Sequence, residues 1–312
     1  MKYDVVGFGA LNVDNIYLVD EIAGVDEETS IRSQKRYIGG SAANTIIGLS
    51  RLGVKCAYIG KIAKDEEGKF IKNRLLDEGV DTRCLITSSD GRSGKVFVFV
   101  DRSGNRAIYV DPGVNDTITI DEIEKICFST KILHLTSFVG KISFKTQKSI
   151  LNKIDSRTTV SFDPGMLYVR MGEKALREFL EKTNILLINE KEIRILCDEE
   201  DYKRAANSLL DYVDIIVVKR GKNSVYLRTK NLELFVPTLK VKCVDTTGAG
   251  DAFNAGFLYG YLNNYSLRKS CMLGNYVASC CIKKFGATDG IPRNLNGFKK
   301  YEERVKNETF YK

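Results

Sequence analysis

Apolar runs alternate with helical patterns along most of the chain, which is typical of a doubly wound, mostly parallel sheet flanked by helices. The run DIIVV at 214–218 shows the continuous β-branched character of a buried parallel strand. The predicted strands cover residues 4–8, 55–62, 131–136, 158–162, 184–188 and 214–218, with an antiparallel pair at 224–227 and 232–236. The predicted helices cover residues 41–52, 65–77, 143–154, 173–182, 189–197, 201–211, 250–262 and 266–284.

Two segments break this rhythm. Residues 15–38 contain extended stretches without a helical pattern, and 94–110 reads as a hairpin that turns at Ser103-Gly104-Asn105. We interpret them together as a small inserted β-sheet that acts as a lid beside the carboxyl ends of the strands. The alternative is a β excursion on the edge of the main sheet. The predicted division is therefore an α/β core that binds nucleotide and substrate, with a β lid; the core comprises 1–14, 39–91 and 111–312, and the lid comprises 15–38 and 92–110.

Composition excludes several classes of protein. Of 312 residues, 43% are hydrophobic and 28% are charged, which is ordinary globular composition and not that of a disordered chain. No run approaches the roughly 20 apolar residues that span a bilayer, and an acidic residue, Asp4, precedes the first apolar run, so we expect neither a membrane span nor a secretory signal. The net charge of +8 is scattered along the chain, whereas nucleic-acid binding needs basic residues clustered on one face. We expect a cytoplasmic protein that binds small molecules.

Few residues are available for metal or acid–base chemistry. The chain has a single histidine, His134, and its eight cysteines form no CxxC pair, so zinc spacing is absent. Acid–base work must therefore fall to carboxylates or lysine. The adjacent Cys280 and Cys281 are interpreted as core thiols in a reducing compartment.

The strongest local motif is Asp245-Thr246-Thr247-Gly248-Ala249-Gly250-Asp251, which follows an apolar strand end and opens a helical pattern. The small residues Gly248, Ala249 and Gly250 let the backbone approach a ligand, and their N–H groups would form an anion site at the helix N-terminus. Asp251, in the first turn, would accept a proton from an attacking hydroxyl group. The alternative is a glycine turn in which Asp251 only stabilises the helix start.

Two further motifs lie near the N-terminus. Gly39-Gly40 precedes a helix from which Asn44 projects, and the alternative is a tight strand–helix turn. Asp14 follows the first strand and could hold the hydroxyl groups of a polyol, or be a simple turn carboxylate. The preceding glycines do not form a dinucleotide fingerprint, because Asn12 replaces the third glycine and no helix follows.

These motifs, in this order, resemble the ribokinase-like, or phosphofructokinase-B, family of carbohydrate and nucleoside kinases over essentially the whole chain. Asn189-Glu190-Lys191-Glu192 is similar to the family's Asn-x-x-Glu element, and 217–224 lies where the family has a nucleotide-binding strand and loop. The resemblance implies an ATP- and Mg²⁺-dependent kinase of the same α/β fold with an inserted β lid.

The resemblance also implies a role for each motif residue. Asp251 is similar to the catalytic base, and Gly248, Ala249 and Gly250 to the anion hole around the γ-phosphate. The resemblance further implies that sugar hydroxyl groups are bound by Asp14, Gly39, Gly40 and Asn44, and that the nucleotide is bound by Lys219, Gly221 and Ser224. Asn189 and Glu192 would organise the ATP phosphates and Mg²⁺, with Glu192 acting on the metal through water. Asp245 and Thr247 would bind a monovalent cation such as K⁺, with Gly286 near the other wall of that site. An Asp with an ordinary pKa near 4 would be a weak base, so proton transfer should come late.

The chain departs from the family pattern at three places. Lys219 stands where the family often has threonine, Ser224 where it often has glycine, and Asp163-Pro164-Gly165 lacks the Asn and Arg that usually follow this Asp in sugar kinases. The primary prediction is phosphorylation of a primary hydroxyl group of a sugar. The alternatives are a nucleoside kinase acting on the 5′-hydroxyl group and, from another class, a non-catalytic ligand-binding module. Apolar residues such as Phe97 and Phe99 on an uncovered lid also predict a homodimer through the lid.

Overall fold

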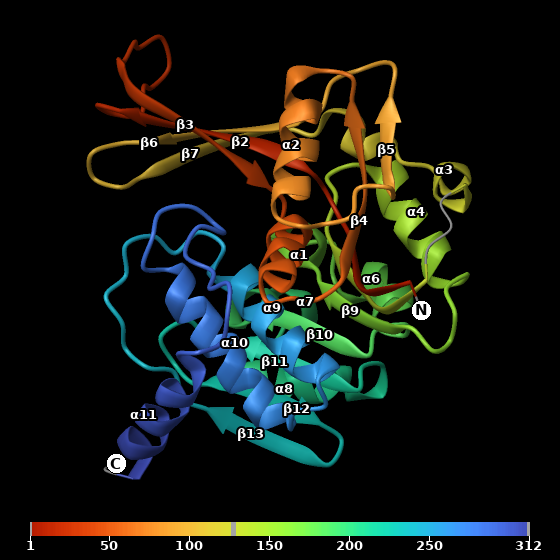
Figure 1. Ribbon diagram of the computed structural model, residues 1–312, viewed down its shortest axis with the longest axis vertical. Coiled ribbons are helices and arrows are strands. Elements are labelled where there is room, and N and C mark those ends of the chain that lie inside the picture. The colour runs from red at the N-terminus through yellow and green to blue at the C-terminus, as the bar shows by residue number, and fades with distance from the viewer. Residues whose placement is uncertain (1, 126–128, 311–312) are drawn as a thin grey trace.

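The computed structural model describes residues 2–125 and 129–310, and within these residues a nine-stranded sheet forms the centre of the molecule (Figure 1). The strand order is β13-β12-β11-β10-β9-β8-β1-β4-β5. The strands from β11 to β5 run parallel, whereas β12 and β13 are antiparallel. The strands are β1 (Tyr3–Phe8), β4 (Cys56–Ala63), β5 (Leu85–Ser88), β8 (Thr130–Thr136), β9 (Thr159–Asp163), β10 (Ile185–Asn189), β11 (Ile215–Lys219), β12 (Val225–Thr229) and β13 (Leu232–Val236).

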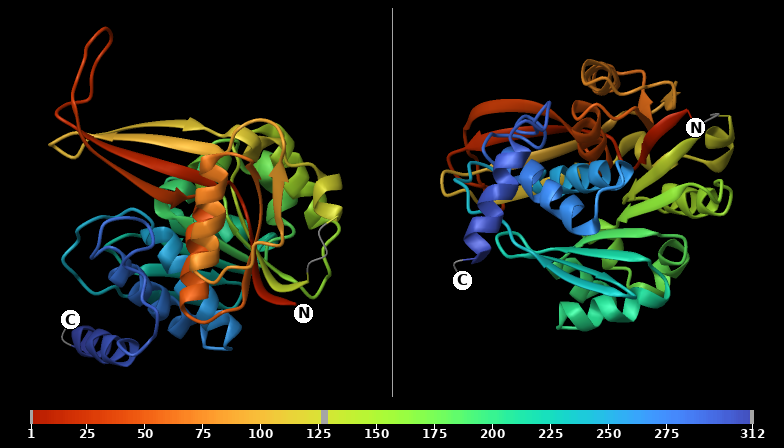
Figure 2. Two further views of the ribbon diagram at one scale, coloured as in Figure 1. Left: turned by 45° about the horizontal axis from the view of Figure 1, so that its top comes forward. Right: turned by 60° about the horizontal axis from the view of Figure 1, so that its bottom comes forward.

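Helices cover both faces of this sheet (Figure 2). The helices are α1 (Ser41–Arg51), α2 (Glu66–Asp77), α3 (Ile120–Glu124), α4 (Lys141–Leu151), α5 (Gly165–Val169), α6 (Glu173–Leu180), α7 (Glu190–Cys197), α8 (Tyr202–Ser208), α9 (Ala249–Leu262), α10 (Leu267–Cys281) and α11 (Phe298–Phe310), with 3₁₀ turns η1 (Gly113–Thr117) and η2 (Leu209–Asp211). On one face, α1, α9 and α10 share a core with Ile185 and Leu187 of β10. On the other face, α4, α6, α7 and α8 pack against Leu186 and Ile188 of the same strand.

This alternation explains the continuous apolar runs in the sequence. A strand with helices on both faces must bury successive side chains in opposite directions. All eight residues of β4 are buried. Each fully buried aliphatic side chain contributes about 1.5–3 kcal/mol, so the two cores together stabilise the central strands strongly.

A second, four-stranded sheet projects beyond the core (Figures 1 and 2). It is formed by β2 (Asn12–Val19), β3 (Ile31–Gly39), β6 (Gly94–Val100) and β7 (Arg106–Asp111) in the order β3-β2-β6-β7. Its central pair, β2 and β6, is parallel, and the outer pairs are antiparallel. The predicted hairpin is confirmed. Asp14 lies in β2, within this small sheet, and not in a turn after β1.

Other expectations need correction. No strand precedes the Asp245 motif, because residues 237–244 form a loop whose end bonds to the carbonyl oxygen of Ile282. The short elements β5, α3 and α5 and the polar helix α11 were not predicted. Within 2–125 and 129–310, no helix has both the length and the apolar character needed to cross a membrane.

Candidate active site

A cavity of about 730 Å³ opens where the central strands end. Asp163, Asn189 and Lys219 are the last residues of β9, β10 and β11, and all three line the cavity. The first residues of α9 line it as well. Ligands of open α/β sheets bind at the carboxyl ends of the strands, so the location fits a substrate site. Of the predicted site residues, those in the lining are Asn189, Glu192, Lys219, Gly221, Ala249, Gly250 and Asp251.

The start of α9 forms one wall of the cavity. Gly248, immediately before the helix, has a left-handed backbone with φ of 73°. A Cβ atom at this position would lie 2.4 Å from the carbonyl oxygen of Ala287, so both conformation and space require glycine. The turn brings main-chain N–H groups of the helix start to the cavity, where they have no acceptor within the helix, although that of Ala249 donates to the preceding carbonyl oxygen of Thr246 at 3.2 Å. This arrangement suits an anion.

Asp251, in the first turn of α9, lies beside these N–H groups. Asn44 donates a hydrogen bond from Nδ2 to Oδ2 of Asp251 at 2.8 Å. Burial raises the pKa of Asp251 to about 7, and the negative charge of Asp163 adds to the rise, whereas the Asn44 hydrogen bond and the charge of Lys219 oppose it. The carboxyl group therefore titrates near neutral pH. The expectation of an ordinary, weakly basic Asp is corrected.

Asp14 and Gly39 of the small sheet lie outside the lining of the large cavity, as do Gly40, which precedes α1, and Asn44 in α1. A Cβ atom on Gly39 would lie 2.0 Å from Oδ1 of Asp14, so glycine is needed for the two residues to pack together across β2 and β3. Burial raises the pKa of Asp14 to about 7. Oδ1 of Asn44 is buried and accepts no hydrogen bond from any residue that the structure describes. An unsatisfied acceptor of this kind beside Asp251 suits a hydroxyl donor from a ligand.

Asn189 and Glu192 form a capping box at the start of α7. The Asn189 side chain accepts from the Glu192 N–H at 2.9 Å, and Glu192 Oε2 accepts from the Asn189 N–H at 3.0 Å. Burial, reinforced by the charge of Asp163, raises the pKa of Glu192. Among the described residues, no group of three metal-ligating side chains converges. A hard cation at Glu192 would therefore take most of its ligands from water and from a phosphorylated ligand, as Mg²⁺ commonly does.

A buried polar network lies between Glu192 and α9. Lys219 Nζ donates to Asp163 Oδ2 at 2.6 Å and to Asn254 Oδ1 at 3.1 Å, and Asn254 Nδ2 donates to the same Asp163 oxygen at 2.7 Å. Asp163 is buried, and although burial opposes ionisation, the adjacent ammonium group of Lys219 keeps its pKa below the usual value. The ion pair is therefore charged at neutral pH.

The loop after β11 is only partly as expected. Gly221 lines the cavity, whereas Ser224 does not and offers its carbonyl oxygen to Arg220 at 3.5 Å. The lining also includes the apolar side chains of Val225, Leu239 and Phe253. The cavity thus combines charged side chains such as Asp251 with apolar side chains suited to a flat, uncharged group.

Asp245 and Thr247 lie just before α9. Asp245 Oδ1 accepts from the N–H group of Thr247 at 3.0 Å and from its hydroxyl group at 2.7 Å, and Oδ2 accepts from the N–H group of Gly286 at 3.0 Å. Gly286 therefore does lie beside Asp245. Arg106 of the small sheet reaches the same carboxylate, with 3.5 Å between Nη2 and Oδ1. The small sheet thus contacts the loop that leads into the anion site.

The sequence motifs did not single out Asn254 or Arg106, and they treated Asp163 only as a departure. Asn254 is fully buried in an otherwise apolar helix, one turn after Asp251. A buried polar residue at that spacing was the available signal. Arg106 has no such signal, since it reaches the site only through the pairing of β7.

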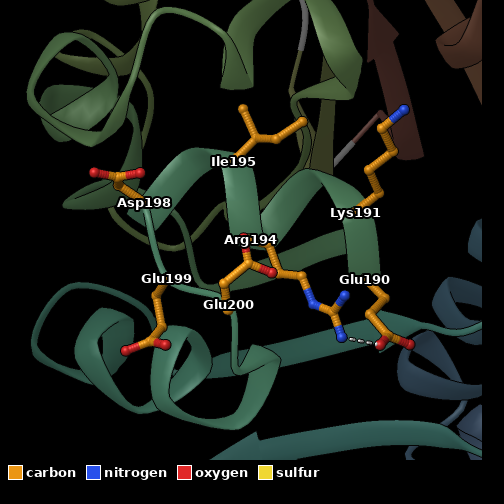
Figure 3. A pocket seen from close by; sticks show the side chains of 7 residues that line it. All are labelled: Glu190, Lys191, Arg194, Ile195, Asp198, Glu199 and Glu200. Carbon is orange, nitrogen blue, oxygen red and sulfur yellow. Dashed lines mark hydrogen bonds and ion pairs between the residues drawn. The ribbon is translucent and has the colours of Figure 1, made fainter.

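A second hollow of about 550 Å³ lies beside α7 and the loop that follows it (Figure 3). Glu190 bonds to Arg194, while the side chains of Asp198, Glu199 and Lys191 point away from one another (Figure 3). The charged groups do not converge on a common point. This hollow carries no candidate site.

Comparisons with known proteins agree on the kind of protein. The model of the pfkB family of carbohydrate kinases matches residues 2–294. An uncharacterized sugar kinase of Archaeoglobus fulgidus is 46% identical over 255 residues, covering 80% of this chain and all of that protein. A nucleoside kinase of Methanocaldococcus jannaschii is 28% identical over 299 residues, covering 93% of each chain.

Solved structures extend the likeness to three dimensions. The crystal structure of the Methanocaldococcus jannaschii nucleoside kinase, described as an archaeal member of the ribokinase family, matches with a TM-score of 0.81 at 26% identity, covering 98% of this chain and 99% of that chain. An uncharacterized sugar kinase of Pyrococcus horikoshii, in complex with ATP, matches with a TM-score of 0.79 at 26% identity, covering 96% and 99%.

Proposed function

Because the chain belongs to the pfkB family of carbohydrate kinases, we propose that it transfers the γ-phosphate of ATP to a primary hydroxyl group of a sugar. The observation that carries this proposal is the placement of Asp251. Its carboxyl group, with a pKa raised to about 7 by burial, lies beside the N–H groups at the start of α9 and lines the 730 Å³ cavity. A base and an anion site are thus adjacent, as phosphoryl transfer to an alcohol requires.

In the proposed reaction, Asp251 accepts the proton of the acceptor hydroxyl group as the oxygen attacks the γ-phosphorus. A bond forms between that oxygen and phosphorus, the bond from phosphorus to the β–γ bridging oxygen breaks, and ADP leaves with the electron pair. The N–H groups of Gly248, Ala249 and Gly250 stabilise the charge on the phosphoryl oxygens. A base with a pKa near 7 matches neutral pH better than an ordinary Asp.

Acceptor binding is assigned to the residues at the base of the small sheet. Asp14 accepts hydrogen bonds from sugar hydroxyl groups, and the main chain at Gly39, which packs closely on Asp14, is assigned to the same ligand. The free Oδ1 of Asn44 accepts from a further hydroxyl group, while Nδ2 holds Asp251. The small sheet then acts as a lid that keeps water from the reacting phosphate.

We assign the ATP phosphates and Mg²⁺ to the charged side chains of the cavity. Glu192 has a carboxylate oxygen beyond the one used in the capping box, and Asn189 lines the cavity beside it. Bound there through water, the metal would neutralise phosphate charge. The nucleotide base is assigned to the apolar side chains of Val225 and Phe253 and to Gly221. A cytoplasmic location follows from the use of ATP.

A monovalent cation such as K⁺ remains part of the proposal at Asp245 and Thr247. Asp245 already accepts three hydrogen bonds and faces Arg106, so no step of the reaction is assigned to the cation. We expect a severalfold higher rate in potassium chloride than in N-methylglucamine chloride at equal ionic strength. Equal rates in the two salts would contradict a K⁺ site, and a complete loss of activity without K⁺ would contradict the minor role given to the cation.

A nucleoside acceptor is the second candidate. It is favoured by the likeness to the Methanocaldococcus jannaschii nucleoside kinase and by the absence of the Asn and Arg that often follow Asp163 in sugar kinases. Nucleosides and sugars present the same primary hydroxyl group to Asp251. The acceptor must therefore be identified by experiment.

The test is an acceptor screen with ATP and Mg²⁺ that measures ADP release and identifies the phosphorylated product. Ribose, fructose and ketodeoxygluconate represent sugars; adenosine, inosine and cytidine represent nucleosides. A sugar phosphate as the main product supports the proposal, and products formed only from nucleosides would replace it with the second candidate.

Asp251→Asn serves as the control for the base in the same screen. We expect turnover to fall by at least about 1,000-fold while ATP affinity is retained, because only the proton acceptor is lost. Turnover close to that of the wild type would reject the role of Asp251. A wild-type protein that binds ATP but phosphorylates no acceptor would favour a binding module.

A further inference from the structure

The buried network around Lys219 has an unused capacity for binding a ligand. Lys219 ends β11 at the floor of the cavity, and its ammonium group bonds to Asp163 and Asn254. The same group lies 3.5 Å from the position that a Cβ atom of Gly250 would occupy. The lysine therefore stands against the anion site at the start of α9.

The number of donors on Lys219 exceeds the bonds assigned to it. An ammonium group has three N–H donors, and Asp163 and Asn254 accept two of them. Lys219 lines the cavity, so the third donor can reach a bound ligand. The acceptor that best fits a cation beside helix N–H groups is a phosphate oxygen.

The carboxyl groups around Lys219 explain why a positive charge is needed at its position. Asp163, Glu192 and Asp251 are all close enough for their negative charges to raise the pKa of Lys219, although burial opposes the rise. Three carboxyl groups at the cavity floor would repel the phosphates of a nucleotide. Lys219 offsets part of this negative charge.

The neighbouring Arg220 also lines the cavity, but its guanidinium group is already paired with other residues. Arg220 Nε donates to Glu190 at 2.9 Å, and its guanidinium group lies 4.4 Å from the centre of the Tyr202 ring. Glu190, visible at the start of α7 in Figure 3, also accepts from Arg194. Arg220 is thus held toward α7 and α8, whereas Lys219 is directed toward α9.

We propose that Lys219 is a catalytic residue whose free N–H donor binds the γ-phosphate of the nucleotide and follows it during transfer. The inference rests on the proposed function and adds a side-chain cation to its main-chain anion site. Asp163 and Asn254 act as positioning residues, since their bonds fix the ammonium group beside Gly250. As the β–γ bond breaks, the ammonium group stabilises the negative charge on the migrating phosphoryl group.

The competing explanation is that Lys219 only neutralises the buried Asp163. Lys219→Met alone cannot separate the two, because it leaves a buried carboxylate without its partner. The decisive comparison is between Asp163→Asn and the double variant Asp163→Asn/Lys219→Met. In the Asp163→Asn background there is no carboxylate to neutralise at this position. Lys219 also lowers the pKa of Asp251, so the comparison is made at pH 9, where Asp251 is ionised, and a further loss there reports a separate role of Lys219.

We expect the second substitution to lower kcat/KM for ATP by about 100-fold in that background, the usual effect of losing one donor to a transition-state oxyanion. A change of less than about threefold would overturn the proposal. Lys230→Met, in the exposed turn between β12 and β13, is the matched control for loss of a lysine charge. Thermal unfolding confirms that each variant is folded.

A binding measurement decides the question without catalysis. Isothermal titration with ATP and with ADP, without acceptor, compares nucleotides that differ only by the γ-phosphate. We expect Lys219→Met to weaken ATP binding about tenfold more than ADP binding; equal losses would overturn the proposal. Because this readout needs no acceptor, a failed acceptor screen with a selective loss of ATP affinity would reject the proposed function but not the γ-phosphate contact of Lys219.

Discussion

The carboxyl group of Asp251 has both a fixed position and a raised pKa. It is held in place by Asn44, and its pKa is raised to about 7, first by burial and then by the charge of Asp163. A base must be ionised to accept a proton, so the active form is present above the pKa and is lost as pH falls through it.

The pH dependence of the reaction follows directly. We expect kcat/KM for the acceptor to rise about tenfold for each pH unit below 7 and to level off above it. A pH–rate profile between pH 5 and pH 9 measures this limb. An acidic limb near pH 4 would show that Asp251 has an ordinary pKa in the functioning enzyme, or that another group limits the rate.

At the scale of elements, the start of α9 depends on a backbone that only glycine adopts easily. Gly248 precedes the helix with φ of 73°, and the carbonyl of Ala287 packs directly against it. Gly172, which precedes α6, has a similar φ of 80° but no atom within 4 Å of its Cβ position. Comparing substitutions at the two glycines therefore separates the energetic cost of a positive φ, which both share, from the cost of a clash with Ala287, which only Gly248 would have.

We expect Gly248→Ala to lower kcat by more than tenfold and to destabilise the protein by about 2–4 kcal/mol, because the new methyl group displaces the loop that shapes the anion site. Gly172→Ala should cost only about 1 kcal/mol and leave kcat unchanged. Turnover and denaturant unfolding of both variants measure these effects. Similar results for the two variants would mean that the contact with Ala287 is unimportant.

Patterns in the sequence predict most elements of the core because burial on both faces of a parallel sheet leaves a direct trace in apolar periodicity. The run DIIVV became β11, and the pattern at 250–262 became α9. The polar helix α11 lacks such a trace. The strand predicted before the Asp245 motif is instead the loop 237–244. Apolar residues of this loop, such as Leu239, pack in the core and line the cavity without forming a strand.

The site was less predictable than the fold. Motif residues next to one another in sequence, such as Gly250 and Asp251, were correctly expected to share a helix start. The Lys219–Asp163–Asn254 network joins two strands to a helix from distant parts of the chain. The raised pKa of Asp251 depends on burial, which no local motif encodes.

At the scale of the whole molecule, the small sheet leaves apolar surface exposed. Ile108 and Tyr109 on its edge strand β7 are 58% and 62% exposed. Phe99 contacts the rings of Tyr17 and Tyr109, and these three residues form an aromatic cluster on one face. Exposed apolar edges of this kind favour association with a second sheet.

We therefore propose a homodimer that forms through the small sheet. Sedimentation equilibrium should give twice the mass of the chain for the wild type and a shift toward monomer for Tyr109→Lys, on the face of the aromatic cluster, because a buried unpaired charge opposes association. Ile142→Lys replaces a residue of α4 that is 52% exposed and should leave the mass unchanged. A monomeric wild type, or equal effects of the two variants, would contradict this interface.

The close contact of Asp14 with Gly39 lies where the small sheet joins the rest of the chain, since β3 ends at Gly39 and α1 begins two residues later. A sugar bound there would contact the junction between the small sheet and the core. Binding of the acceptor would then favour the position of the small sheet that excludes water, so hydrolysis of ATP by water should stay slow until the true acceptor is bound.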